Sequence, residues 1–416
     1  MDVKGWVAPG FEPVREAFEE NFRQGKEDGA ACAVFLRGEP VVDLWGGVRD
    51  PKTGAPWEED TIVNVFSTTK GMSSMALAVA HSRGLFDYDE RVATYWPEFA
   101  AHGKEHVTVR QLLSHQAGLA AITRKLDLDV LADPDRVAET IGEQAPAWTP
   151  GEHHGYHGIT LGFYEGELLR RVDPQGRTIG RFFADEVAAP LGLDFHIGLT
   201  DDVDRSRIAP IQGDHYALRM LFNLHKLPAA FVLGFLAPWS ITHRAFSNPA
   251  ILGVPARYND EALRRIELPA SNGHGTARSV AKAYGAFATG GAALGLKPET
   301  LAALEQPAAP PARGTFDLVL RREMTFSLGY CKPSSAFPFG SSDRAFGTPG
   351  AGGSFGFADP DLQLGFAYVM NRMDFYLVAD PREAALSRAA VACAARLAAR
   401  EPSAVAASGP GASNAT

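Results

Sequence analysis

The stretch from Thr61 to His81 constrains this chain more than any other. An apolar approach over residues 61–66 leads to Ser67 and Lys70, and residues 72–81 (MSSMALAVAH) then carry few polar side chains. A helix that is apolar around most of its circumference is buried in a large core rather than laid on a surface. Gly84 follows where a helix stop is expected. The sequence therefore predicts a buried central helix with a serine at its amino-terminal end.

This helix places Ser67 and Lys70 for nucleophilic chemistry. Residues three apart lie on the same face of a helix, one turn from each other. The positive end of the helix and its free backbone N–H groups face the serine hydroxyl. A lysine one turn away can take the serine proton if burial or cations lower its pKa. The same spacing recurs at Ser279 and Lys282, where a pair on a helix surface is the simpler interpretation, so the spacing alone does not identify a nucleophile.

Composition excludes several classes of partner. The 416 residues are 45% hydrophobic and 21% charged, with a formal net charge of −9, which is an ordinary globular balance with enough apolar residues for a large core. An acidic chain without a long basic run is a poor match for nucleic acid or an anionic membrane. No secretory apolar segment follows Met1, so we expect a cytoplasmic protein. The most apolar run, residues 227–239, is too short and too interrupted by proline to span a bilayer.

Metal and disulfide chemistry have little support in the sequence. The three cysteines lie far apart in apolar contexts, which suits buried thiols rather than a metal pair or a disulfide framework. His153, His154 and His157 form a loop cluster, but no carboxylate or cysteine is placed to complete a coordination geometry. We therefore expect neither a metal nor a cofactor.

The order of the predicted elements indicates an α+β architecture. Predicted helices cover residues 11–23, 107–115, 159–172, 179–189, 277–289 and 381–400, and predicted strands cover residues 30–36, 41–45, 324–331, 354–358 and 364–370. We expect residues 1–85 and 275–400 to build one antiparallel sheet flanked by helices. Residues 86–274 would form a mainly helical domain on the other side of a cleft. Residues 401–416 have the composition of a disordered tail.

Ser354 is a competing nucleophile. It lies in Gly352-Gly-Ser-Phe-Gly356, which matches the G-x-S-x-G nucleophile elbow of α/β-hydrolases. That fold requires an acid and then a histidine after the serine. All twelve histidines of the chain lie at or before His274. The triad cannot close in its usual order, so we attribute the match to a glycine-rich strand.

Several motifs in a fixed order carry a resemblance to a known family. They are Phe66-Ser-Thr-Thr-Lys-Gly71, Leu112-Leu-Ser-His-Gln-Ala-Gly-Leu119, Trp148-Thr-Pro-Gly151 ahead of Tyr156-His-Gly158, Asn272-Gly-His-Gly-Thr-Ala-Arg278, and Gly347-Thr-Pro-Gly-Ala-Gly-Gly-Ser354 with Asp359-Pro360. The chain resembles the serine β-lactamase-related family over about residues 10 to 395. Within that family it is most similar to the class C-like esterases called family VIII carboxylesterases. The resemblance implies a fold like that of β-lactamases and penicillin-binding proteins.

The resemblance also implies catalytic roles for three residues. Ser67 would be the acylated nucleophile, and Lys70 would orient it and share its proton. Tyr156 matches the family's tyrosine, which works with the lysine as general base and later returns a proton to the leaving group. A phenol has a pKa near 10. We therefore expect Lys70 to hold Tyr156 partly as phenolate.

The glycine-rich stretch that begins at Thr348 would supply the oxyanion hole and part of the substrate site. In the family an edge strand passes the nucleophile, and the backbone N–H groups of Ser67 and Ala351 would bind the developing oxyanion. Glycines let a substrate lie close to such a strand. The residues expected to contact substrate are Thr348, Gly350, Gly352, Gly353, Gln116 and His157.

Two positions depart from the β-lactamases of this family. Gly158 stands where they have an asparagine, and Thr348 stands where they have a lysine. The amide and the carboxylate of a β-lactam would lose two of their usual partners. We therefore expect a carboxylesterase that acts on small-molecule esters of low charge.

Other functions stay open at this stage. The same site would serve a β-lactamase, a D-amino-acid peptidase or an acyltransferase. Outside enzymes, a penicillin-binding-like sensor would be acylated on its serine without turnover. The sequence does not set the oligomeric state, and a homo-oligomer is compatible with it.

Overall fold

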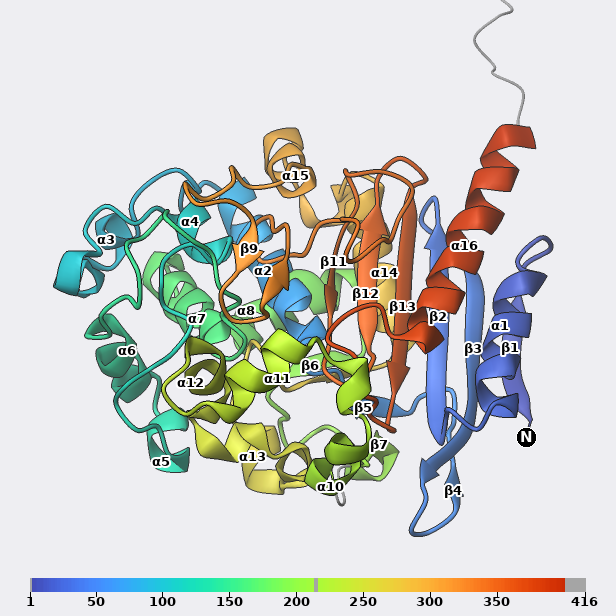
Figure 1. Cartoon of the computed structure of the whole chain (residues 1–416). Helices are drawn as coiled ribbons and strands as arrows, with labels where there is room; N and C mark the ends of the chain where they lie inside the picture. Colours follow the sequence, from blue (N-terminus) through green and yellow to red (C-terminus); the bar gives the residue numbers. More distant parts are fainter. Residues whose placement is uncertain (1, 213–215, 401–416) are drawn as a thin grey trace, which may run out of the picture.

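The computed structural model describes residues 2–212 and 216–400, so the tail predicted at residues 401–416 lies outside the described residues. A seven-stranded sheet organises one half of the molecule, and every pair of neighbouring strands in it is antiparallel (Figure 1). Its order is β1-β3-β2-β13-β12-β11, with β4 paired to β3. The strands are β1 (Val3–Val7), β2 (Gly29–Leu36), β3 (Glu39–Asp50), β4 (Ala55–Pro56), β11 (Phe346–Pro349), β12 (Phe355–Asp359) and β13 (Leu364–Met370). The first four come from the start of the chain and the last three from its end.

Helices cover both faces of this sheet. Tight contact of α14 (Ala277–Ala288) with β13 is possible because Gly285 and Gly365 meet: a Cβ on Gly365 would lie 2.2 Å from the Gly285 nitrogen. Tyr368, three residues along β13, points to the opposite face, since strand side chains alternate. Its hydroxyl hydrogen-bonds Glu27, which is paired with Arg382 of α16 (Pro381–Arg400). Helix α1 (Glu12–Arg23) packs beside α16 on this second face (Figure 1).

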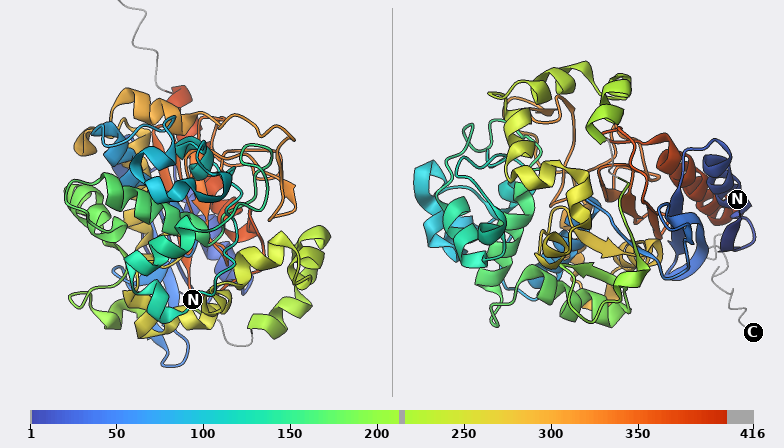
Figure 2. Two further views of the ribbon diagram at one scale, coloured as in Figure 1. Left: turned by 90° about the vertical axis from the view of Figure 1, so that its left-hand side faces the viewer. Right: turned by 90° about the horizontal axis from the view of Figure 1, so that it is seen from below.

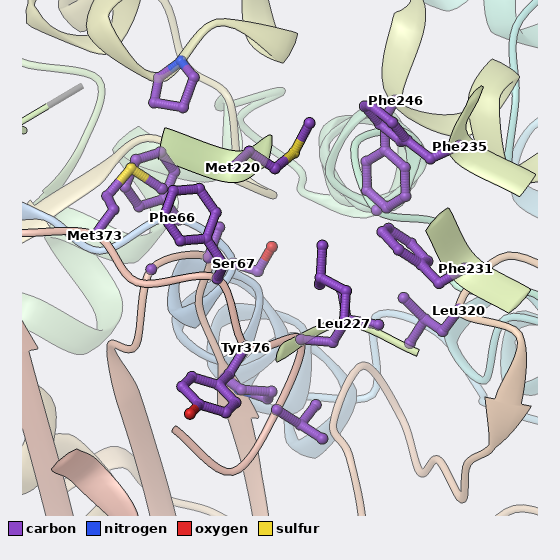
Figure 3. Close-up of a pocket in the computed structure, with 18 of the residues that line it drawn as sticks. Phe66, Ser67, Met220, Leu227, Phe231, Phe235, Phe246, Leu320, Met373 and Tyr376 are labelled. Atoms are coloured by element: carbon purple, nitrogen blue, oxygen red, sulfur yellow. The ribbon is translucent and has the colours of Figure 1, made fainter. Parts of the chain in front are cut away.

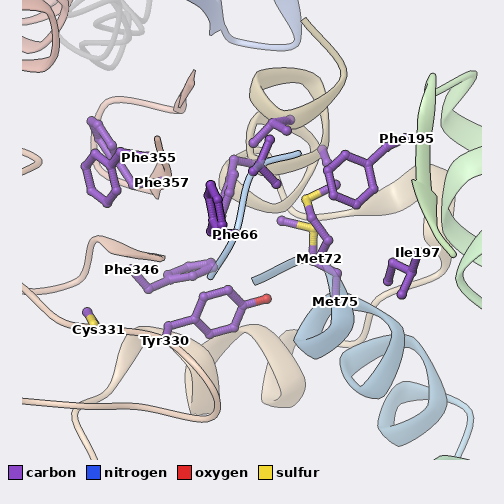
Figure 4. Packing of buried hydrophobic residues seen from close by; sticks show 14 of the residues in the cluster. Phe66, Met72, Met75, Phe195, Ile197, Tyr330, Cys331, Phe346, Phe355 and Phe357 are labelled. Atoms are coloured by element: carbon purple, nitrogen blue, oxygen red, sulfur yellow. The ribbon is translucent and has the colours of Figure 1, made fainter. Parts of the chain in front are cut away.

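Helix α2 (Thr68–Ser82) forms the centre of the core. Every residue of α2 except His81 is buried, as its apolar sequence predicts. Figure 4 shows Met72 and Met75 of this helix near Tyr330 and Phe195, which come from segments far apart in the chain. The nucleophile candidate at the start of α2 is therefore held by a helix that is buried along almost its whole length.

Shorter elements build the rest of the molecule. A second sheet has the order β6-β8-β5-β7, from β5 (Ile62–Asn64), β6 (Phe195–Ile197), β7 (Ile208–Ala209) and β8 (Gly273–Gly275). The helices here are α3 (Val92–Tyr95), α4 (Val109–Leu113), α5 (Leu128–Leu131), α6 (Pro134–Gly142), α7 (Thr160–Val172), α8 (Ile179–Phe183), α9 (Ala189–Leu191), α10 (Tyr216–Phe222), α11 (Ala229–Leu236), α12 (Ile241–Ser247), α13 (Glu261–Arg265) and α15 (Pro298–Glu305). Helices α10 to α12, drawn yellow-green, stand at the edge of the molecule in both views of Figure 2. None of the helices in the described ranges has the length and hydropathy needed to cross a bilayer.

The predicted strand at residues 324–331 is wrong. This segment makes only single bridges, from Phe326 to Cys331 and from Cys331 to Gly347, and the short β9 (Phe316–Asp317) and β10 (Arg322–Glu323) precede it. Gly329 has a φ of +82°, and the Ser327 N–H bonds the Tyr330 carbonyl, so the chain turns here instead of extending. Its apolar residues fill the core around α2 without joining a sheet.

Candidate active site

Ser67 lies at the junction of β5 and α2. It is the N-cap residue of α2 and is partly exposed. Phe66 before it has a φ of +45°, a left-handed conformation that costs a non-glycine residue about 1–3 kcal/mol. The Val65 N–H is fixed to the Gly273 carbonyl of β8 at 2.9 Å. The strained turn thus directs the serine out of the core at the positive end of a buried helix.

Lys70 is fully buried behind this serine. Its Nζ lies 3.0 Å from Ser67 Oγ, 2.6 Å from the Gly158 carbonyl and 2.9 Å from the Ala270 carbonyl. Burial lowers the pKa of Lys70 to about 7. A neutral amine has two N–H groups and one lone pair. The two carbonyls take both N–H groups, so the lone pair of the neutral form faces Ser67 Oγ.

Tyr156 lies on the other side of the serine, in the loop before α7. Its hydroxyl hydrogen-bonds Ser67, and Lys70 Nζ sits over its ring, 4.9 Å from the centroid. The ring is stacked on Phe326, with centroids 6.3 Å apart. Burial raises the pKa of the Tyr156 phenol. This direction runs against the expectation that Lys70 holds the phenol partly as phenolate, because burial disfavours the charged form of both groups.

The turn between β11 and β12 faces Ser67. The chain bends at residues 350–353, so Ala351 is exposed in a turn and not in a strand as expected. Among the described residues, no acceptor bonds the backbone N–H of either Ser67 or Ala351. The Ser354 hydroxyl donates to the Val65 carbonyl at 2.7 Å and lies 3.1 Å from Thr68 Oγ1. Ser354 thus ties this turn to the strand-to-helix junction.

A buried ion network supports the same turn from behind. Arg382 donates to the Gly352 carbonyl and is paired with Asp380 at 2.8 Å and with Glu27 at 3.3 Å. Gly353 has a φ of +120°, and a Cβ there would lie 2.6 Å from Arg382 Nη2. Glycine is therefore required at this position by both conformation and space.

A mostly apolar cavity of about 280 Å³ opens at Ser67 (Figure 3). Ser67 carries its hydroxyl toward this space, with Phe231, Phe235 and Phe246 across from it. The wall from the α10–α11 segment consists of Met220, Leu221, Leu224, Leu227, Phe231, Val232, Phe235 and Leu236. The opposite wall includes residues 373–378 together with Leu320, Met324 and Cys331. Among the described lining residues Asp374 alone carries a charge, and it is paired with Lys226 at 2.6 Å.

Several residues expected to contact substrate lie elsewhere. Ser67, Tyr156, Ala351 and Gly352 line the cavity. Thr348 is buried and its hydroxyl bonds Tyr284 at 3.4 Å, while Gly350 and Gly353 pack behind the turn. Gln116 donates to the Ala309 carbonyl at 2.8 Å, away from the cavity. None of these four positions therefore lines the cavity.

His157 is also not placed against a substrate. It is fully buried, and its Nε2 accepts the Leu119 N–H at 3.0 Å while its Nδ1 lies 2.9 Å from the Gly155 carbonyl. Burial lowers the pKa of His157 to about 3, so the ring is neutral. The Nδ1 of His115 accepts the backbone N–H of His157 at 3.1 Å, and the His115 ring packs edge-on against Tyr156. The two histidines therefore hold the Tyr156 loop in place.

The other candidates from the sequence have structural partners. Ser354 is 1% exposed and does not line the cavity. Ser279 accepts the Asp194 backbone N–H at 2.8 Å and the hydroxyl of Thr276, the N-cap residue of α14. Within residues 2–212 and 216–400, no three His, Cys, Asp or Glu side chains are grouped so that they could hold a metal ion.

Sequence reasoning missed three features of the site. The carbonyls of Gly158 and Ala270 are backbone groups and leave no side-chain signal. The strained Phe66 has no special residue type to mark it. Residues 373–378 line the cavity because the loop after β13 folds back over α10, a contact between segments far apart in sequence.

Comparison with known proteins shows the family. A family model described as Beta-lactamase matches residues 14–389. The chain belongs to the beta-lactamase family. It is 34% identical over 378 residues to Esterase/beta-lactamase LipL of Mycobacterium tuberculosis (strain ATCC 25618 / H37Rv), covering 89% of this chain and 83% of the relative.

Solved structures of the beta-lactamase family agree with this assignment. A crystal structure of a family VIII carboxylesterase superposes with a TM-score of 0.81 at 36% identity, covering 94% of this chain and 100% of that one. A penicillin-binding protein homolog from Caulobacter crescentus superposes with a TM-score of 0.83 at 36% identity, covering 94% of this chain and 100% of that one. The predicted resemblance and the predicted fold are both confirmed, and the protein is an enzyme, a serine hydrolase of the beta-lactamase family.

Proposed function

We propose that this protein hydrolyses uncharged carboxylic esters through an acyl-enzyme on Ser67. One observation carries the proposal: the Ser67 hydroxyl, in contact with Lys70 and Tyr156, faces an apolar cavity in which none of the described lining residues is a cation. Family membership supports acyl chemistry on a serine. The character of the cavity supports an uncharged ester as the substrate.

In the proposed acylation step, neutral Lys70 takes the Ser67 proton as Oγ attacks the ester carbonyl. The pKa of about 7 leaves a large share of the amine neutral at neutral pH. The Gly158 and Ala270 carbonyls orient the amine by accepting its two N–H groups. General base catalysis of this kind contributes typically about 10²- to 10⁴-fold.

Tyr156 is proposed as the acid of the first half-reaction. Its phenol is neutral and bonds Ser67, so it is placed to donate its proton as the C–O bond to the leaving alcohol breaks. Lys70, now an ammonium, returns the serine's proton to the phenolate. Water then attacks the acyl group, its proton passes to Lys70, and the acid leaves as Ser67 regains its proton. Each proton removed is returned, so the pair ends in its starting state.

The backbone N–H groups of Ser67 and Ala351 are proposed to hold the oxyanion. Both lack protein acceptors among the described residues, and Ser354 and Arg382 fix the turn that carries Ala351. Donors that are already oriented stabilise developing negative charge without reorganisation, typically by about 3–4 kcal/mol per donor.

Two positions favour an ester over a β-lactam. A Cβ on Gly158 would lie 2.6 Å from the ring of Phe246, so the space used by an asparagine amide in related β-lactamases is filled by an apolar ring. Thr348 points to Tyr284 in the core and offers no cation for a carboxylate. LipL is named both an esterase and a β-lactamase, so lactam hydrolysis is the second candidate, and we propose that it is weak.

A panel of p-nitrophenyl esters with nitrocefin tests the proposal. Wild-type protein should cleave uncharged esters much faster than nitrocefin, and Ser67→Ala should remove both activities. Ser279→Ala is the matched control, since Ser279 has the same Ser-x-x-Lys spacing and should keep full activity. A fluorophosphonate probe should label wild-type protein on the Ser67 peptide. Unchanged ester hydrolysis in Ser67→Ala, or a label on another serine, would disprove the assignment.

A further inference from the structure

Six large apolar side chains are exposed on the α10–α11 segment. They come from α10, from α11 and from the residues just after α11, and each is between 55% and 83% exposed. We call this set the apolar collar: Leu218, Leu221, Phe222, Leu233, Leu236 and Trp239. Residues spaced three or four apart share a helix face, so the members on each helix point in a common direction. Exposed apolar patches of this kind mark contact sites in soluble proteins.

The apolar collar is continuous with the cavity at Ser67. Leu221 and Leu236 belong to both, since each lines the cavity and is more than 60% exposed. Leu218, Phe222, Leu233 and Trp239 lie within three residues of Leu221 or Leu236 in the chain, are exposed, and do not line the cavity. A ligand that covers the apolar collar therefore lies at the mouth of the cavity.

The charge pattern of this segment differs from that of the whole chain. The protein has 49 acidic residues and a net charge of −9, yet no Asp or Glu occurs from Tyr216 to Asn259. Two of its cations are turned inward: Arg219 donates to the Met373 carbonyl at 3.0 Å, and Lys226 pairs with Asp374 at 2.6 Å. Contact of this segment with an apolar phase would require no carboxylate of its own to lose its water, a step that is otherwise costly.

We propose that the apolar collar docks on the surface of aggregated, uncharged ester and passes single molecules into the cavity. The inference rests on the proposed ester hydrolysis and adds the physical state of the substrate. A second copy of the chain is a weaker occupant, because stable interfaces use about 20–30 residues per partner and the apolar collar has six. Trp239, 83% exposed, suits the edge of such a contact, since its ring is apolar and its N–H polar.

One ester measured below and above its solubility limit tests this proposal. With tributyrin, wild-type protein should show a disproportionate rise in rate once droplets form. Phe222→Ser/Trp239→Ser changes two members that do not line the cavity. The double variant should hydrolyse dissolved tributyrin at a rate within about twofold of the wild-type rate. Its rate on droplets should be about tenfold or more below the wild-type rate. Trp6→Ser, at a 44% exposed tryptophan on β1, is the matched control and should behave like wild type.

A binding assay separates this inference from the proposed chemistry. Ser67→Ala protein should float with triolein droplets, and the same protein with Phe222→Ser/Trp239→Ser should stay in solution. Binding without any ester hydrolysis by wild type would sink the proposed function and leave the docking surface standing. Three outcomes would overturn the docking proposal. The two proteins could float equally, or wild type and the double variant could have equal rates on droplets. Light scattering could also show a wild-type dimer that the double variant converts to a monomer. Leu233→Ser alone repeats the test if the double variant does not fold.

Discussion

The pKa of Lys70 gives a sharp test of the proposed base. Burial lowers it to about 7, and in the proposed mechanism the reactive form is the neutral amine. That form makes up about half of the protein at pH 7, about a tenth at pH 6 and about a hundredth at pH 5. The kcat/KM for a dissolved ester should therefore fall about tenfold per pH unit on the acid side, with the midpoint near pH 7.

Lys70→Met tests the same group by removal. Loss of the base should lower kcat/KM about 10²- to 10⁴-fold and abolish the acid limb of the profile. Lys104→Met is a matched control, because Lys104 is equally buried and donates to three carbonyls, of Ala101, Gly142 and Gln144. Those three bonds take all its N–H groups, so this lysine faces no hydroxyl. Its removal should lower the melting temperature and leave the pH profile in place.

Three results would refute this account of Lys70. One is a kcat/KM that stays flat between pH 5 and pH 8 in wild-type protein. Another is a folded Lys70→Met protein with the same midpoint as wild type, because the midpoint would then belong to another group. A profile that moves equally in Lys104→Met would also show that the shift reflects stability and not the base.

Three further predictions test the surroundings of the site. Tyr156→Phe should lower kcat about 10²- to 10⁴-fold at an unchanged melting temperature, because only the proton donor is lost. Gly353→Ala should lower the free energy of unfolding in urea by about 1–3 kcal/mol, whereas Gly295→Ala, with φ +64° and open space, should cost less. Burial raises the pKa of Glu165 to about 8, so the folded state binds this proton more tightly than the unfolded chain does. The free energy of unfolding should therefore fall as the pH rises from about 4.5 to 8. Glu165→Gln should flatten that pH dependence in thermal unfolding.

Each of these has a contradicting outcome. Full activity in Tyr156→Phe would exclude the phenol as the acid. An equal loss of stability in the two glycine variants would show that crowding against Arg382 is unimportant. An unchanged slope in Glu165→Gln would mean that other groups dominate the pH dependence of folding.

The regular elements were predictable because their causes are local. The apolar sequence of α2, the hairpin of β2 and β3, and the helices α1, α14 and α16 follow from periodicity, turns and stops. The turn within residues 324–331 was not predictable, because the apolar residues of this segment satisfy the strand pattern while Gly329 turns the chain. The turn at Ala351 was missed for the same reason, since glycines in a strand and glycines in a turn look alike in sequence.

The sequence by itself determined which residues are available for the chemistry: a serine and a lysine one helical turn apart, a tyrosine in a loop, and the order of motifs that indicated the family. Tertiary structure alone decided their protonation and surroundings. Two distant backbone carbonyls orient Lys70, burial lowers its pKa while raising that of Tyr156, and the loop after β13 meets α10 to close an apolar cavity. Desolvation depends on every neighbour in space, and no local pattern of residues records it.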